Sequence, residues 1–147
     1  MDNKFSRRKF ISLCFSILGF FLFKDALSFL TSKTGDEQEG MISFGRPEDY
    51  PAPGVYKGNG AWLVRDARGF FALNSRCSHL GCSVVEWDEG RGIFICPCHN
   101  SKYGLDGSVL EGPAAAPLKP VQVTVDGKGN IVVDLKQQVP KDSRLAV

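Results

Sequence analysis

Two short segments of the sequence read Cys77-Ser78-His79-Leu80-Gly81-Cys82 and Cys96-Pro97-Cys98-His99-Asn100-Ser101. Together they hold both histidines of the chain and four of its five cysteines. Thiolate sulfur and imidazole nitrogen are the ligands that proteins use for zinc and for several iron–sulfur clusters. The two segments therefore predict a metal centre held between two loops.

Two cysteines and two histidines complete the ligand shell of a 2Fe–2S cluster. We expect the thiolates of Cys77 and Cys96 to bind one iron, and the imidazoles of His79 and His99 to bind the other. Exchanging two thiolates for neutral imidazoles lowers the negative charge of the cluster, which raises its potential to roughly −150 to +300 mV. A cluster in this range can accept an electron from a mild reductant such as a quinol.

A structural zinc site with the same four ligands is the alternative. Its ligand pairs usually stand two to four residues apart, whereas a single residue separates Cys77 from His79. Zinc also gives no reason for the second pair of cysteines, Cys82 and Cys98. The spacing therefore favours the iron–sulfur cluster.

Residue types, order and spacing in both segments resemble the Rieske iron–sulfur proteins, specifically those with loops of the form Cys-x-His-x-Gly-Cys and Cys-x-Cys-His-x-Ser. The resemblance implies a 2Fe–2S cofactor and a disulfide between Cys82 and Cys98 that pins the loops together. Such a bond requires an oxidising compartment. The resemblance also implies that a cluster-bound histidine contacts the electron donor, and we expect this to be His99, with His79 also exposed.

Residues near the two segments match positions that tune the cluster in respiratory and photosynthetic Rieske proteins. Ser101 and Tyr103 match the serine and tyrosine that donate hydrogen bonds to cluster and cysteine sulfur, which raises the potential. Leu80 matches a residue that shields the cluster from water. Asn100 stands where the family usually has glycine, and asparagine tolerates a left-handed backbone better than most residues.

A proline-rich stretch follows the second loop. It reads Gly112-Pro113-Ala114-Ala115-Ala116-Pro117 and resembles the family's proline loop, which lies over the cluster as a third wall. Because proline restricts φ, the stretch should be stiff.

The first 30 residues look like an export signal, either cleaved or retained as a membrane anchor. Because Ala26-Leu27-Ser28 is only a poor small-residue cleavage site, retention is favoured. Lys4, Arg7, Arg8 and Lys9 precede an uncharged apolar run over residues 10–23, and Ser6-Arg7-Arg8-Lys9-Phe10-Ile11 resembles a twin-arginine signal. The apolar run has 14 residues, against roughly 20 for a bilayer span; continuing to residue 30 gives the required length. We expect a single N-terminal helix in a bacterial inner membrane, with the cluster domain on the periplasmic side.

A polar segment over residues 31–43 is expected to be a flexible linker. Residues 44–136 contain short apolar runs separated by glycine, proline and Asp-Gly breaks, which predict an all-β, small antiparallel sandwich or barrel with a cluster-binding loop subdomain. Residues 137–147 are expected to form a loose C-terminal tail. The expected strands lie at 61–65, 70–73, 84–87, 93–95, 121–125 and 131–135.

Charge excludes some functions. Residues 31–147 carry 13 basic and 14 acidic side chains, so nothing indicates a nucleic-acid partner. No glycine-rich phosphate loop or nucleophile–histidine–acid set is evident, and both histidines are committed as ligands.

The resemblance to the iron–sulfur subunit of cytochrome bc-type complexes implies a function. Such a subunit accepts an electron from membrane quinol and passes it to a c-type cytochrome, as part of an oxidoreductase with cytochrome b-type and c-type subunits. The small Rieske subunit of arsenite oxidase, a molybdoenzyme, is an alternative with the same loops and export signal. A Rieske ferredoxin of aromatic oxygenases would normally lack Cys82 and Cys98, and a zinc-stabilised binding module would not be redox active.

Overall fold

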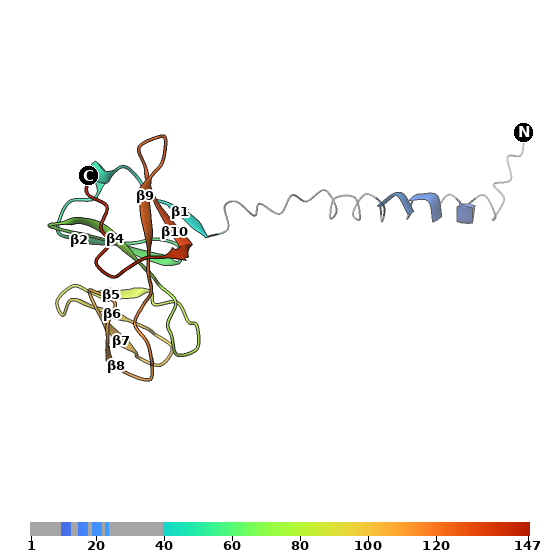
Figure 1. The fold of residues 1–147 in the computed structure, drawn as a ribbon. Coiled ribbons are helices and arrows are strands. Elements are labelled where there is room, and N and C mark those ends of the chain that lie inside the picture. The colour runs from blue at the N-terminus through green and yellow to red at the C-terminus, as the bar shows by residue number, and fades with distance from the viewer. Residues whose placement is uncertain (1–9, 13–14, 18, 22, 24–39) are drawn as a thin grey trace, which may run out of the picture. The chain divides into compact units, whose positions relative to one another are not determined.

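The computed structural model describes residues 10–12, 15–17, 19–21, 23 and 40–147 (Figure 1). The described residues before position 24 are helical, as expected for an N-terminal hydrophobic helix. None of the helices in the described ranges is long and apolar enough to cross a membrane. The remainder of the expected anchor, most of the twin-arginine-like motif and linker residues 31–39 lie outside the described residues.

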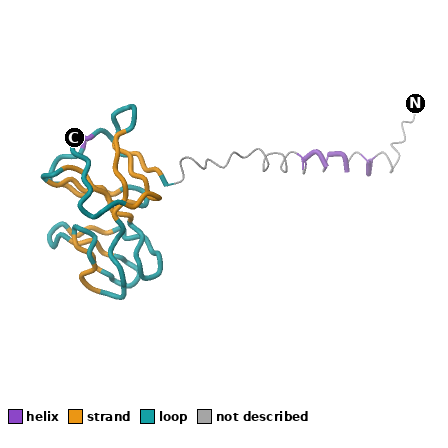
Figure 2. The backbone as a smooth tube through the Cα atoms, viewed as in Figure 1, coloured by secondary structure: helices purple, strands orange, loops and turns teal. Residues whose placement is uncertain are grey.

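Strands dominate the unit formed by Gly40–Val147 (Figure 2). They are β1 (Met41–Ser43), β2 (Gly54–Lys57), β3 (Ala61–Asp66), β4 (Gly69–Asn74), β5 (Glu86–Asp88), β6 (Ile93–Ile95), β7 (Lys102–Gly104), β8 (Val109–Glu111), β9 (Pro120–Val125) and β10 (Ile131–Gln138), with a 3-10 turn, η1, at Pro47–Asp49. One sheet has the order β1-β10-β9-β4-β3-β2 and the other the order β5-β6-β7-β8. All paired strands are antiparallel, which confirms the predicted all-β class.

The hairpin of β3 and β4 is the centre of the larger sheet. Successive side chains of a strand point to opposite faces, and here both faces are covered. Trp62 and Leu73 pack into one core cluster, whereas Leu63 and Phe70 pack into the other. Burial on both sides explains why these strands are continuous apolar runs rather than alternating ones.

The first of these cores joins the larger sheet to the smaller one. Phe94 of β6 is fully buried, and its ring centroid lies 5.0 Å from that of Trp62 and 4.6 Å from that of Trp87. The indole nitrogen of Trp62 donates a hydrogen bond of 2.8 Å to the carbonyl of Val84. Figure 1 shows β5–β8 gathered as a separate group below the larger sheet, and this group carries the second cysteine–histidine segment between β6 and β7.

All six predicted strands are present, but β2, β7 and β8 were not predicted. Three further differences concern the start of β5, the linker and the tail. Val84 was expected to begin a strand, but β5 begins at Glu86 because the Val84 amide bonds to Ser75 instead. Met41–Ser43, assigned by sequence to the linker, forms β1 on the edge of the larger sheet. The expected loose tail is attached, since Leu145 and Phe70 exchange two backbone hydrogen bonds.

Arg144 fixes this C-terminal segment to the β3–β4 hairpin. Its guanidinium stacks 4.0 Å from the ring centroid of Phe71, donates to Asp66 at 3.0 Å and bonds two carbonyls of its own segment. Burial alone raises the pKa of Asp66, but hydrogen bonds from Arg144 and Arg68 outweigh it and hold the pKa below its usual value. The pair therefore stabilises the fold above the unfolded-state pKa, near 4.

We expect Arg144→Ala to lower the free energy of unfolding by about 1–2 kcal/mol at neutral pH, because a stacked cation and a partly buried ion pair are lost. Urea denaturation at pH 7 measures this. The loss should shrink as pH falls through the folded-state pKa of Asp66. Arg68→Ala, which removes only an exposed 3.6 Å contact to the same carboxylate, is the control, and an equal loss there would contradict the account.

Candidate metal centre

The two cysteine–histidine segments fold into loops with the same backbone pattern. In the first, the amide of Cys77 donates to the carbonyl of Cys82 at 2.8 Å, and the amide of Gly81 donates back to Cys77 at 3.0 Å. In the second, the corresponding bonds run from Cys96 to Ser101 and from Asn100 to Cys96, both at 2.9 Å. Each loop is thus a closed six-residue turn that begins with a buried cysteine.

The fifth position of each loop has a left-handed backbone. Gly81 has a φ of 77° and Asn100 a φ of 57°, and asparagine is enriched among the non-glycine residues that adopt this region. This equivalence explains why Asn100 preserves the turn although the family usually has glycine there.

A disulfide joins the loops, between Cys82 and Cys98, as expected. The sulfur of Cys96 lies within 4.8 Å of both of these sulfurs. Because the disulfide has consumed two of the three thiols, Cys96 is the one that can bind a metal there. The bond therefore holds the second loop against the first without competing for a ligand site.

The two histidine rings, one from each loop, lie close together in an edge-to-face arrangement. Their centroids lie 4.7 Å apart and their planes meet at 87°. His99 is exposed, whereas His79 is half-buried, and its Nδ1 is a buried nitrogen without a hydrogen-bond partner. A buried polar atom left unsatisfied is costly, so this nitrogen is suited to a ligand bond.

The free cysteines of the two loops are both buried. Cys77 is 3% exposed and Cys96 is 2% exposed. Burial raises the pKa of the Cys77 thiol, but hydrogen bonds, the strongest from Tyr103, outweigh it and leave the pKa below its usual value. Burial and the neighbouring Cys77 sulfur raise the pKa of Cys96. Ionising both thiols together therefore requires a compensating cation, as a metal centre supplies.

Ser101 and Tyr103 lie where they can donate to sulfur. The hydroxyl of Tyr103 is fully buried and donates to Cys77 Sγ at 3.1 Å. The hydroxyl oxygen of Ser101, also fully buried, accepts a 3.2 Å hydrogen bond from the amide of Ala114. That acceptor bond leaves the Ser101 proton free to donate, and the Ser101 hydroxyl is one of the groups that lower the pKa of Cys77.

The proline-rich stretch contacts both loops. A side chain at Gly112, where φ is 99°, would place its Cβ only 2.6 Å from Ser101 Cα, so only glycine allows this approach to the second loop. Towards the first loop, the Ser78 hydroxyl donates to the carbonyl of Ala116 at 2.7 Å and accepts from its amide at 3.1 Å. Sequence reasoning named Gly112, Pro113 and Pro117 but missed Ser78, whose role depends on a contact 38 residues away in the chain.

Leu80 is 71% exposed beside His79. An exposed leucine next to a half-buried histidine presents apolar surface beside the first loop of residues 40–147, the unit called the head below. The sequence motif thus brings together two buried thiols, two facing imidazoles and two hydroxyl donors, a set that fits a 2Fe–2S group.

Comparison with known proteins agrees with this geometry. Residues 45–136 match the family described as the Rieske [2Fe-2S] domain. The cytochrome b6-f complex iron-sulfur subunit of Synechococcus sp. (strain JA-3-3Ab) is 47% identical over 73 residues, which cover 48% of this chain and 42% of that protein. The subunit of the same name from Prochlorococcus marinus (strain MIT 9515) is 44% identical over 79 residues, covering 52% and 44%.

The matched segment spans less than half the length of these curated relatives. Among solved structures, a chain of a hyperthermophilic respiratory Complex III is similar in fold, with a TM-score of 0.50 and 20% sequence identity. That match covers 86% of this chain and 99% of the other.

Proposed function

The chain belongs to the Rieske [2Fe-2S] domain family, and from this premise we propose that it is the electron-carrying subunit of a quinol–cytochrome c oxidoreductase-type complex. The cluster, when bound, takes up and returns one electron. The observation that carries the proposal is the pair of imidazoles whose ring centroids lie 4.7 Å apart, on the same two loops as two buried free thiols. Relatives named as cytochrome b6-f iron-sulfur subunits support the assignment to such a complex.

We assign the ligands by depth in the head. Cys77 and Cys96, which are buried, would hold one iron of the cluster through their thiolates, and His79 and His99 would hold the other through their imidazoles. The exposure of His99 leaves its outer ring nitrogen free to accept a hydrogen bond, and then a proton, from the hydroxyl of a membrane quinol. Exposed Leu80 offers the apolar contact that a quinol ring or the surface around it requires.

The proposed complex places the head outside a bacterial inner membrane. The Cys82–Cys98 disulfide supports this side, because disulfides persist in oxidising compartments. Residues 1–30 are proposed to supply the anchor and residues 31–39 the connection to the head. A cytochrome b-type subunit and a c-type cytochrome are the proposed protein partners.

We expect the combined substitution Ser101→Ala and Tyr103→Phe to lower the midpoint potential of the cluster. The Tyr103 hydroxyl donates to Cys77 Sγ, and the buried Ser101 hydroxyl has its proton free to donate to a cluster sulfur, so both should stabilise the reduced, more negative state. If each bond favours that state by about 1.4 kcal/mol, the potential falls by roughly 60 mV per bond. Potentiometric titration measures the change, and Ser108→Ala, whose hydroxyl bonds Asp106 instead, is the control. An unchanged midpoint potential would show that the Ser101 and Tyr103 hydroxyls do not tune the cluster.

The function is tested in membranes from cells with and without the chain. Removal should abolish quinol-dependent reduction of a c-type cytochrome, and the wild-type chain should restore it. The Ser101→Ala, Tyr103→Phe variant should restore it at a lower rate, because a lower potential weakens the driving force for quinol oxidation. Loss of arsenite oxidation with quinol activity intact would instead assign the chain to a molybdoenzyme.

A further inference from the structure

An open groove with a volume of about 480 Å³ lies beside the first cysteine–histidine loop. His79 and Leu80 border it on the side of the loop, and Pro117 borders it on the side of the proline-rich stretch. Arg76 and Lys119 supply the charge, and no carboxylate lines it. The groove is therefore a cationic depression with apolar walls next to a proposed cluster ligand.

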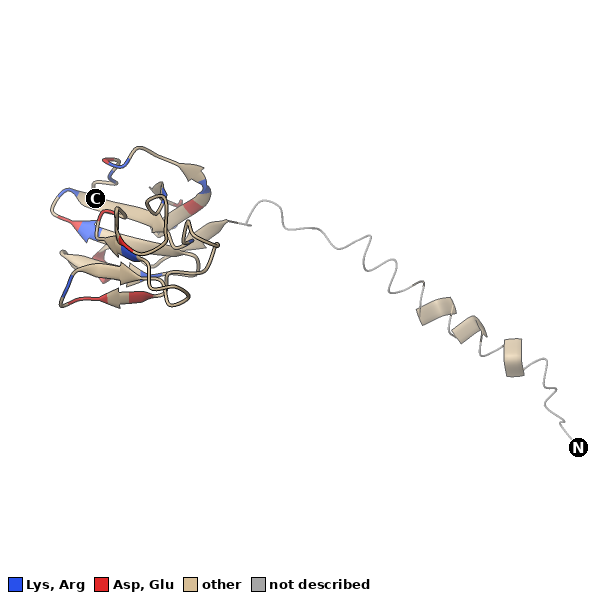
Figure 3. Cartoon of the chain, turned by 90° about the horizontal axis from the view of Figure 1, so that it is seen from below, with Lys and Arg blue, Asp and Glu red and all other residues tan. Residues whose placement is uncertain are grey.

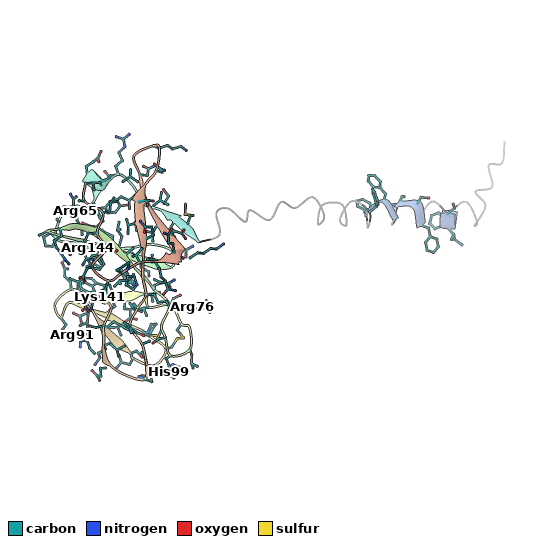
Figure 4. The ribbon with its side chains drawn as sticks, viewed as in Figure 1. Arg65, Arg76, Arg91, His99, Lys141 and Arg144 are labelled. Atoms are coloured by element: carbon teal, nitrogen blue, oxygen red, sulfur yellow. A yellow bond between two sulfur atoms is a disulfide. The ribbon has the colours of Figure 1, made fainter. Side chains whose placement is uncertain are left out.

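The arginine in this groove is held against the loop. A side chain at Gly81 would place its Cβ 3.1 Å from Arg76 Nε, so the guanidinium lies directly over the glycine. Figure 4 shows Arg76 and His99 in the part of the head that carries the loops, away from Arg65. A planar donor group thus lies at the mouth of the groove.

Neither cation of the groove is neutralised. Basic and acidic residues alternate along the ribbon of residues 40–147 (Figure 3). Many of the cations are paired: Arg91, Lys102, Lys141 and Arg144 each contact a carboxylate at 3.0 Å or less. Within the described residues, Arg76 and Lys119 have no such partner. Two unpaired cations in one concave site are complementary to carboxylates from another molecule.

We propose that this groove docks an acidic peptide segment of a partner protein that exchanges electrons with the head. The proposal rests on the proposed electron-carrier function but concerns a surface beside the cluster ligands. A guanidinium binds carboxylates bidentately, and the apolar walls accept the methylene groups of Glu or Asp side chains. A concave site suits a peptide segment better than the surface of a bilayer.

Docking and cluster charge should be coupled. Carboxylates bound beside His79 disfavour the added negative charge of the reduced cluster, so the segment should bind the oxidised head more tightly. By linkage, the bound segment must lower the midpoint potential. Docking in the groove would thus favour release of the electron while the partner is in place.

The test measures binding of a fluorescently labelled hexaglutamate peptide to the full-length, cluster-loaded chain at low ionic strength. Arg76→Gln with Lys119→Gln should weaken binding about tenfold, since two exposed ion pairs are lost. The matched control, Lys57→Gln with Lys128→Gln, removes the same charge from exposed lysines outside the groove and should bind like the wild type. Saturating peptide should lower the midpoint potential of the wild type but not of the groove variant.

Equal weakening by both double variants would overturn the proposal, because binding would then follow net charge alone. A second arm uses vesicles of phosphatidylcholine and phosphatidylglycerol. Vesicle binding that depends on Arg76 and Lys119, with peptide binding unaffected, would assign the groove to a membrane and also overturn the proposal. Quinol-dependent reduction of a c-type cytochrome is measured in a separate membrane assay. Failure of the docking site and failure of the proposed function can therefore be distinguished.

Discussion

Replacing Cys96 by serine is expected to leave the chain unable to hold iron while the fold is kept. The side chain is 2% exposed and begins the second loop, and serine differs from it only in the ligand atom. Iron content should fall from about two atoms per chain, as a [2Fe-2S] domain requires, to a small fraction of that. The visible absorption of the cluster should vanish with it. Iron analysis and the absorption spectrum measure both effects.

Cys14→Ser is the matched control, because Cys14 is the one cysteine outside both loops. This variant should keep its iron and colour. A colourless Cys96→Ser variant with the near-ultraviolet circular dichroism of the wild type would show that the site, and not the fold, has been lost. Full retention of iron in Cys96→Ser would contradict the proposed ligand set.

The second large effect is expected from removing the disulfide with Cys82→Ala and Cys98→Ala together. The two cysteines are 16 residues apart, and closing a loop of this size stabilises a protein by about 3 kcal/mol, mostly by restricting the unfolded chain. The variant should still assemble the cluster, because neither residue is a proposed ligand. It should lose the cluster faster on warming, since the two loops are no longer joined. Absorbance followed during a temperature ramp measures the loss.

Chemical reduction provides an internal comparison. The wild-type chain treated with a thiol reductant should approach the stability of the double variant, whereas the double variant should not respond to the reductant. Equal cluster retention by the variant and the untreated wild type would exclude a role for the disulfide in holding the loops.

The sequence predicted the fold class and the candidate site because both are encoded locally. The central hairpin is visible in the sequence as two apolar runs on either side of Asp66–Gly69. The structure pairs these two strands with Asp66 opposite Gly69. The candidate metal site could be predicted because each loop is a turn of six consecutive residues whose ligand types and spacing are specific. The Cys82–Cys98 disulfide was expected from the resemblance and is present.

The features that the sequence did not predict depend on contacts between distant segments. Nothing in the sequence around Ser78 indicates a role for this residue, which becomes evident only from its two hydrogen bonds to the backbone of Ala116. Leu145 is attached because Phe70 offers a free backbone edge, which no local pattern reveals. The groove between Arg76 and Lys119 likewise forms only when the first loop and the proline-rich stretch meet.

An electron paramagnetic resonance spectrum of the reduced full-length chain, recorded during a redox titration, tests the central claim most directly. We predict the signal of a 2Fe–2S cluster that titrates as a one-electron couple between roughly −150 and +300 mV. Pulsed electron paramagnetic resonance of the same sample should show hyperfine couplings to the nitrogens of two imidazoles. Labelling the histidines with nitrogen-15 should change these couplings, which would identify their source as imidazole. A silent spectrum from protein that binds zinc but no iron, or a signal without histidine nitrogen, would contradict the account.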